Sequence, residues 1–169
     1  EEGVLVYAHA VDEGAAELAI SNGVDGLVHW PGVNRVQPDE LMQQLIHDQI
    51  PVITTFNFFI RTPEDVRRLL DAGGIIAMGS DAIGAFQQAS LPFIEMNIMI
   101  EAGMTPMEVI IAATANSAEV VGLGDLVGTL EIGKMADIIV INGDPLTDFS
   151  VMPDVIIVIK GGEVIVSPE

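Results

Sequence analysis

Residues 4–29 decide the fold, and their sequence is VLVYAHAVDEGAAELAISNGVDGLVH. The apolar run from Val4 to Ala8 is typical of a strand that is buried on both faces. Residues 12–21 then place alanine and leucine at helical spacing, and the Asn-Gly dipeptide that follows is a common helix end. Gly26 to Val28 is a second short apolar run. This order predicts a β-strand, a crossover helix and a neighbouring parallel strand.

The same alternation continues through the first two-thirds of the chain and gives four predicted βα units. The further strands and helices are expected at 38–48 (helix), 51–56 (strand), 62–72 (helix), 75–78 (strand), 92–102 (helix) and 106–121 (helix). Two of these helices follow a Thr-Pro dipeptide with an acidic residue close behind. We therefore expect Thr62 and Thr105 to be N-caps, each with proline at the first helical position.

Beyond Gly122 the sequence changes character and becomes rich in β-branched residues. The segments 137–141, 155–160 and 163–166 are separated by turn sequences, which favours a small antiparallel sheet. The fold class predicted from the whole pattern is α/β, with parallel strands first and an antiparallel sheet at the end.

Composition and charge exclude several classes of protein. The chain has 169 residues, of which 50% are hydrophobic, and a mean hydropathy of +0.49, so we expect a sizeable core rather than a disordered protein. Six Lys and Arg residues against 25 Asp and Glu give a net charge of −19. Such a surface repels phosphate backbones and anionic lipids, which argues against nucleic-acid and membrane-surface partners.

The absence of cysteine removes disulfides, thiolate zinc sites and a cysteine nucleophile from consideration. The longest apolar runs are far shorter than the roughly 20 residues of a membrane helix. No basic segment precedes an apolar one at the start of the sequence. These features favour a cytoplasmic over a secreted protein and leave the compartment open.

Three residues of metal-ligating type stand at equivalent ends of the predicted strands. His9 closes the first strand, His29 follows the second and Asp81 follows the fourth. Because the carboxyl ends of parallel strands face the active-site mouth, two imidazoles and one carboxylate there favour a site for zinc or a similar divalent ion. Each residue alone could instead be a hydrogen-bonded core histidine or a turn-capping aspartate. His47 lies within a predicted helix and is expected outside the cluster.

Several motifs resemble the metal-dependent amidohydrolase superfamily, in particular its imidazolonepropionase-like and prolidase-like branches. They cover nearly the whole chain, and the part from Gly103 to Asp144 is highly specific. The motifs are VYAHA (6–10), AISNGVDGLVH (19–29), MGSDA (78–82), EAGMTPME (101–108), AATANSA (112–118) and GTLEIGKMADIIV (128–140). The resemblance implies strands five to eight, the C-terminal half of a (β/α)8 TIM-type barrel, at residues 1–127. It further implies the C-terminal part of a small β-sandwich domain at residues 128–169.

The resemblance also implies a chemistry. It assigns His9 and His29 as metal ligands and Asp81 as ligand and proton shuttle. The residue types themselves make zinc the favoured divalent metal. The bound ion would activate water to hydrolyse carbon–nitrogen bonds in small amide, cyclic amide or dipeptide-like substrates. The loop residues that could contact substrate are Ser80, Asn57, Phe58 and Trp30, with plain packing as the alternative for the two aromatic side chains.

Two features of the family are missing from this sequence. No His-x-His occurs, and the only lysines, Lys134 and Lys160, lie in the β-rich tail. Half a barrel leaves strand edges and an apolar face open, so we expect a homo-oligomer or a complementary N-terminal half as partner. Because two histidines and one aspartate bind metal weakly, a catalytically silent, self-associating module is the alternative to an enzyme. An open doubly wound binding domain is disfavoured, since no Gly-x-Gly-x-x-Gly follows a strand.

Overall fold

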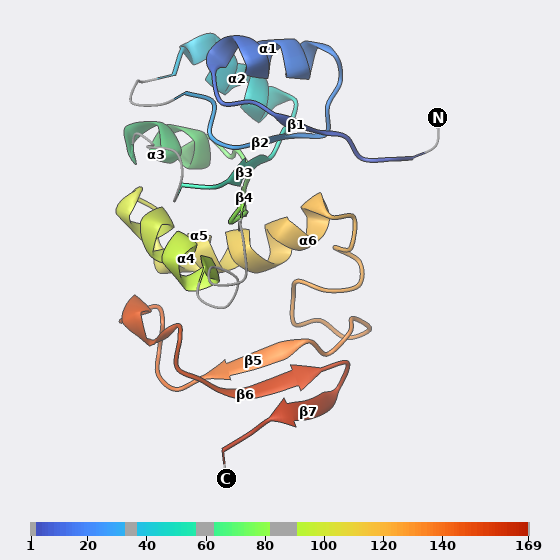
Figure 1. Cartoon of the computed structure of the whole chain (residues 1–169), viewed down its shortest axis with the longest axis vertical. Helices are drawn as coiled ribbons and strands as arrows, with labels where there is room; N and C mark the ends of the chain where they lie inside the picture. The colour runs from blue at the N-terminus through green and yellow to red at the C-terminus, as the bar shows by residue number, and fades with distance from the viewer. Residues whose placement is uncertain (1–2, 33–36, 57–62, 82–90, 169) are drawn as a thin grey trace. The chain divides into compact units, whose positions relative to one another are not determined.

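The computed structural model describes residues 3–32, 37–56, 63–81 and 91–168. The chain divides into two compact units, Glu1–Thr105 and Pro106–Glu169, and each contains its own sheet (Figure 1). The domain boundary expected between residues 127 and 128 stays a prediction, because compactness does not reveal how the parts of a longer relative are divided.

The first unit alternates strands and helices. Its elements are β1 (Tyr7–His9), α1 (Glu13–Ser21), β2 (Gly26–Val28), α2 (Asp39–His47), β3 (Val52–Thr54), α3 (Pro63–Asp71), β4 (Ile76–Met78) and α4 (Leu91–Glu101). Within the described residues, the strands form one parallel sheet in the order β1-β2-β3-β4. The predicted βα alternation and α/β class are confirmed, whereas closure into a barrel stays a prediction.

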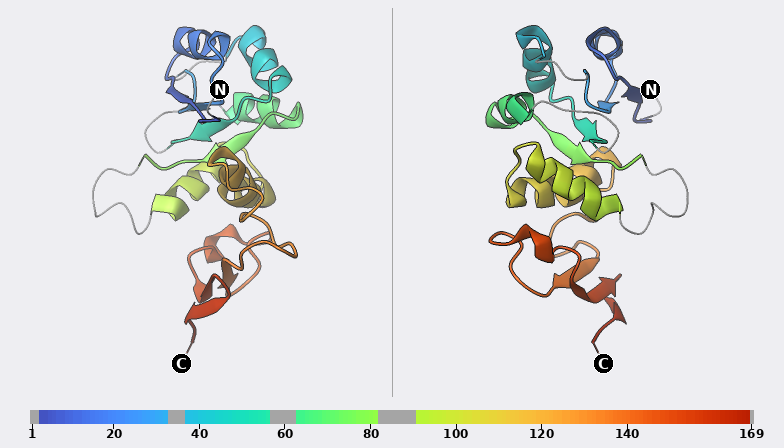
Figure 2. Two further views of the ribbon diagram at one scale, coloured as in Figure 1. Left: turned by 90° about the vertical axis from the view of Figure 1, so that its right-hand side faces the viewer. Right: turned by 60° about the vertical axis from the view of Figure 1, so that its left-hand side comes forward.

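The core of the first unit is centred on one row of the sheet. The strand register aligns Ala8 with Leu27, Leu27 with Val52 and Val52 with Ile76, and the last three side chains are completely buried. Helix α1 packs against α2, and α2 packs against α3 (Figure 2). Apolar side chains from the sheet and these helices therefore exclude water together, which is the main stabilising contribution in such a layer.

The first strand is shorter than the sequence predicts. The expected strand from Val4 to Ala8 is wrong in its first half, because β1 begins at Tyr7 and Val4, Leu5 and Val6 are exposed. The backbone of Val6 is held by Asp25, whose carboxylate accepts from the Val6 amide at 2.7 Å and whose amide donates to the Val6 carbonyl at 2.8 Å. An outer strand of the described sheet has one neighbour only, so a continuous apolar sequence there does not guarantee burial on both faces.

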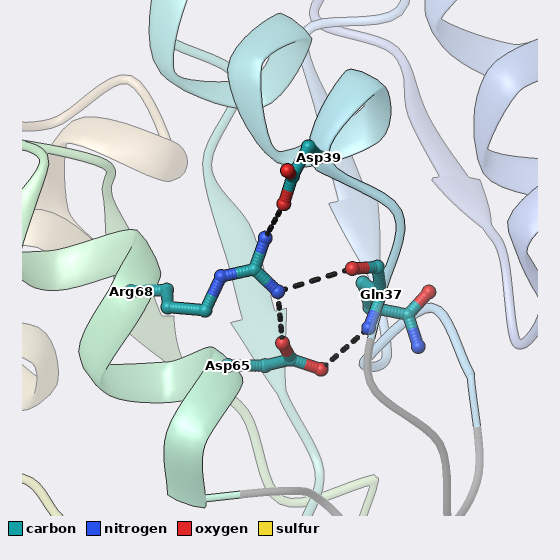
Figure 3. Close-up of polar contacts among 4 residues, drawn as sticks. All are labelled: Gln37, Asp39, Asp65 and Arg68. Atoms are coloured by element: carbon teal, nitrogen blue, oxygen red, sulfur yellow. Dashed lines mark hydrogen bonds and ion pairs between the residues drawn. The ribbon is translucent and has the colours of Figure 1, made fainter.

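A buried carboxylate ties α3 to the segment that leads into α2 (Figure 3). The completely buried Asp65 accepts from the Gln37 backbone amide at 2.8 Å and from Arg68 Nη1 at 2.7 Å. The same guanidinium nitrogen donates to the Gln37 carbonyl at 3.0 Å, and Nη2 pairs with Asp39. Burial of an ionised group is tolerated when it is paired and hydrogen-bonded in this way. We call Gln37, Asp39, Asp65 and Arg68 the Asp65 cluster.

The second unit begins with a helical segment that the sequence predicts as one helix over 106–121. It consists of α5 (Pro106–Ile111), a π-helical turn (Ala112–Asn116) and α6 (Ser117–Val120). Hydroxyl groups bond to carbonyls in this stretch, from Thr114 to Ile110 at 2.6 Å and from Ser117 to Ala112 at 2.7 Å. Such side-chain bonds compete with the regular helical ladder, which gives the difference from a straight helix a physical cause.

Glycine is required at position 128, where the chain returns and packs against the π-helical turn. Gly128 has φ +96°, and a Cβ atom there would lie 2.6 Å from the Ala118 Cβ and 3.0 Å from the Thr114 carbonyl oxygen. A larger residue would therefore meet both a backbone conformation that favours glycine and a steric clash.

The antiparallel sheet predicted for the end of the chain is confirmed. Strands β5 (Ile138–Ile141), β6 (Val155–Lys160) and β7 (Glu163–Val166) pair in sequence order. The β6–β7 turn consists of Gly161 and Gly162, whose φ angles of +57° and +87° suit a tight hairpin. A short 3-10 helix, Phe149–Val151, precedes β6. In the part of the chain with described coordinates, no helix is long and apolar enough to cross a membrane.

The predicted helix starts are confirmed in position. Helix α3 begins at Pro63 and α5 at Pro106, as the Thr-Pro dipeptides indicate. Thr62 lies outside the described residues, and the capping bond of Thr105 stays a prediction. An N-cap is present at α1, where the Asp12 carboxylate accepts from the Ala15 amide at 2.9 Å.

Candidate functional site

The carboxyl edge of the parallel sheet carries the candidate residues. His9 is the last residue of β1, His29 directly follows β2, and Thr55 directly follows β3. Asp81 lies three residues beyond the end of β4. Because all four strands are parallel, these positions share one edge of the sheet. The structure therefore places the three sequence-predicted ligands at the same edge of the sheet.

The two histidines are in direct contact. His29 Nε2 lies 2.8 Å from His9 Nδ1, and the rings meet edge to face with centroids 4.4 Å apart and planes at 78°. The other nitrogen of His29, Nδ1, lies 2.5 Å from the Thr55 hydroxyl oxygen. His29 is only 3% exposed, whereas His9 is exposed. Each imidazole thus directs one nitrogen at a nitrogen of the other ring, with His29 on the buried side of the contact and His9 on the solvent side.

The backbone at this edge adopts a conformation that most residues avoid. His29 has φ +77° and Asp81 has φ +45°, both in the left-handed region. The sheet still holds His29 in place, because its amide donates to the Ile53 carbonyl at 3.0 Å. Left-handed non-glycine residues cost of order 1–3 kcal/mol and are enriched at functional sites. The observation supports a functional role for this edge of the sheet.

The surroundings of His29 disfavour the protonated form of its ring. Burial lowers the pKa of His29 below its ordinary value near 6.5, and the His9 imidazole lowers it further. The Asp81 carboxylate acts in the opposite direction and raises that pKa. A neutral imidazole has one nitrogen without a proton, so His29 can offer a lone pair at pH 7.

The two facing nitrogens lie slightly closer together than two ligands of one metal ion. In tetrahedral zinc sites, Zn–N bonds of about 2.0–2.1 Å hold two ligand nitrogens about 3.3 Å apart. The facing nitrogens of His9 and His29, now at 2.8 Å, would have to separate by about 0.5 Å. Among residues whose positions are described, no three His, Cys, Asp or Glu side chains form a group that could hold a metal ion. The role of Asp81 as a third ligand stays a prediction.

The remaining sequence-predicted residues divide into those that pack and those outside the described chain. Trp30 is buried and meets Phe56 edge to face at 5.8 Å, so the packing alternative holds for Trp30. His47 is exposed on α2 beside Asp48 and lies outside the cluster, as expected. Ser80 is half-buried between β4 and Asp81. The predicted substrate-contact residues Asn57 and Phe58 lie outside the described residues.

Three supporting residues were not predicted from the sequence. Thr55 contacts His29, as described above. The buried Glu95 of α4 accepts from the Phe56 amide at 2.8 Å and so fixes the backbone next to Thr55. Gly79 allows β4 to approach β3 closely, since a Cβ there would lie 2.7 Å from the Thr54 carbonyl oxygen. Only the position of Thr55, at the end of an apolar run, offers a signal in the sequence, and it is a weak one.

Comparison with known proteins identifies the family of the chain. The profile of the Amidohydrolase family matches residues 60–165. The chain belongs to the amidohydrolase family. The resemblance to this superfamily that the sequence motifs indicate is therefore confirmed.

Curated relatives of this amidohydrolase chain are imidazolonepropionases. The protein from Geobacillus kaustophilus (strain HTA426) is 39% identical over 163 residues, which cover 91% of this chain and 37% of that protein. The protein from Geobacillus thermodenitrificans (strain NG80-2) is 31% identical over 160 residues, again 91% of this chain and 37% of that protein. The amidohydrolase chain thus spans little more than a third of these relatives.

Solved structures give the same assignment. A structure of molinate hydrolase matches 96% of this amidohydrolase chain and 43% of its own chain, with a TM-score of 0.82 and 26% identity. A Xaa-Pro dipeptidase with bound methionine in its active site matches 96% of this chain and 45% of its own, with a TM-score of 0.79 and 28% identity.

Proposed function

We propose that this chain contributes metal ligands to a hydrolase of carbon–nitrogen bonds and corresponds to the C-terminal half of its (β/α)8 barrel plus part of a β-sandwich. The observation that carries the proposal is the contact of 2.8 Å between His9 Nδ1 and His29 Nε2 at the carboxyl edge of a parallel sheet. Amidohydrolases generally use divalent metals. The relatives that are imidazolonepropionases and a Xaa-Pro dipeptidase support a cyclic amide, amide or dipeptide-like substrate.

The proposed roles follow from the chemistry of each side chain. His9 and His29 would hold the metal through their facing nitrogens, and two imidazoles favour zinc. A bound divalent ion would lower the pKa of a water molecule and polarise the scissile carbonyl. The Asp81 carboxylate is exposed at the same edge, so its oxygens can accept a proton from the attacking water and return it to the leaving nitrogen.

Zinc binding to single-histidine variants tests the ligand assignment. The chain has three histidines, and His47 is exposed on α2 away from the pair, so His47→Ala is a matched control for His9→Ala and His29→Ala. We expect calorimetric titration to show one zinc site in the parent and in His47→Ala. The two site variants should lose it. Equal zinc affinity in His29→Ala and His47→Ala would refute the proposal.

A second candidate is a catalytically silent half-barrel that self-associates or pairs with an N-terminal half. It is favoured by the exposed apolar side chains of Val4, Leu5 and Val6 beside the outer strand β1. Exposed apolar runs next to an unpaired strand edge promote association. Sedimentation velocity distinguishes the states: we expect a particle larger than one chain, whereas a monomer at micromolar concentration would contradict self-association.

A further inference from the structure

We propose that Thr55 is the positioning residue of His29: its hydroxyl orients the ring and accepts a hydrogen bond from Nδ1–H when Nε2 binds a cation. The inference rests on the proposed metal site and names a residue that contacts His29 at the nitrogen facing away from that site. It follows from a contact that the sequence did not indicate, the 2.5 Å separation of Thr55 Oγ1 from His29 Nδ1.

The contact is rigid because both side chains are enclosed. Thr55 is 1% exposed and His29 is 3% exposed. The backbone on both sides of the contact is fixed, since the His29 amide donates to the Ile53 carbonyl at 3.0 Å and the Phe56 amide donates to the Glu95 carboxylate at 2.8 Å. An enclosed hydrogen bond between fixed backbones leaves the imidazole little freedom to rotate.

The chemistry of a hydroxyl suits this position. A neutral imidazole carries one proton, on either of its two nitrogens, while a threonine hydroxyl can donate or accept. Without a cation, Thr55 can serve either tautomer of His29. With a cation at Nε2, the ring proton must be on Nδ1, and the Thr55 hydroxyl oxygen then accepts a hydrogen bond from Nδ1–H. Such partners behind a ligating histidine fix its tautomer and orientation, and their loss typically weakens metal binding about 10–100-fold.

The neighbouring threonine supplies a matched control. Thr54 is also completely buried, but among the described residues its hydroxyl has no hydrogen-bond partner. Thr54→Val and Thr55→Val therefore make the same chemical change one residue apart, and only the second removes a bond to His29. Thr55→Ser retains the hydroxyl and removes a methyl group.

The experiment combines two measurements on the 169-residue chain labelled with 15N-histidine. Nitrogen NMR of the zinc-free protein reports the tautomer and environment of each imidazole, with exposed His47 as the internal reference. Zinc titration by calorimetry then gives the affinity. Circular dichroism of each variant establishes that it is folded.

We expect Thr55→Val to move the His29 ring-nitrogen signals and to raise the zinc Kd about 10–100-fold. Thr55→Ser and Thr54→Val should retain the parent spectrum and affinity, and the His47 signals should not move in any variant. His29 signals and a Kd in Thr55→Val that match those of Thr54→Val would overturn the inference. If the parent itself fails to bind zinc, the proposed metal site is refuted, while the zinc-free spectra still decide whether Thr55 orients the ring.

Discussion

Replacing Asp65 by alanine is expected to destabilise the first unit by about 3–5 kcal/mol, the usual cost of removing one partner from a buried ion pair. The Asp65 side chain is 0% exposed, and its two oxygens accept from Arg68 at 2.7 Å and from the Gln37 amide at 2.8 Å. Hydrogen bonds to a charged group contribute about 1.5–3 kcal/mol each. Two such bonds give about 3–6 kcal/mol, which overlaps the ion-pair estimate.

A control on the same helix isolates the effect of burial. Asp71 forms an i,i+4 ion pair with Arg67, but its side chain is 67% exposed. Exposed pairs contribute about 0–1 kcal/mol, so Asp71→Ala should change stability little. Asp65→Asn keeps one oxygen acceptor and should fall between the two alanine variants.

The single tryptophan makes the measurement specific to the first unit. Trp30 is buried against Phe56, so its fluorescence in a urea titration reports the unfolding of that unit. Asp65→Ala should move the midpoint far below that of Asp71→Ala, or leave the unit unfolded without urea. Midpoints for the two variants that agree within error would refute the stabilising role of the Asp65 cluster.

Three further predictions concern the second unit and the residue that precedes it. Gly128→Ala should destabilise the second unit by about 1–3 kcal/mol through overpacking. Gly133 also has a positive φ, but a Cβ atom there would meet open space, so Gly133→Ala should cost less. Urea melts of the two variants, followed by circular dichroism, compare their stabilities. The hydrogen bond from Lys160 lowers the pKa of Asp137. Its contribution to stability is therefore complete above the ordinary Asp pKa and is lost as the pH falls through the lowered pKa. In an acid titration, Lys160→Met should lose less stability than the parent. Thr105→Ala should cost about 1 kcal/mol if Thr105 caps α5, and an unchanged urea midpoint would place the cap elsewhere.

The arrangement of strands and helices could be predicted because local patterns carry it. The apolar runs at Gly26–Val28 and Ile76–Met78 and the prolines that open α3 and α5 are visible in the sequence, and the structure agrees with them. The placement of His9 and His29 followed from one rule about parallel strands. Contact between the two rings needed only the additional fact that β1 and β2 are neighbours.

The parts that could not be predicted depend on residues far apart in the chain. Asp25 holds the backbone of Val6 across 19 positions, and Thr55 meets His29 across 26. The apolar sequence at Val4 predicted a strand there, but strand formation also depends on a pairing partner, and Val4 is exposed outside β1. The π-turn depends on hydroxyl-to-carbonyl bonds such as that of Thr114, which a helical apolar pattern does not reveal.

The left-handed backbone at Asp81 has a consequence for protein engineering. At φ +45°, an exposed position suits glycine better than a residue with a Cβ atom, so Asp81→Gly relieves strain without opening a cavity. The same substitution removes the carboxylate proposed to move the proton. Directed evolution that selects this chain for thermal stability alone would therefore enrich variants that are more stable but lack the proposed activity. A second selection for metal binding or turnover is needed to retain Asp81.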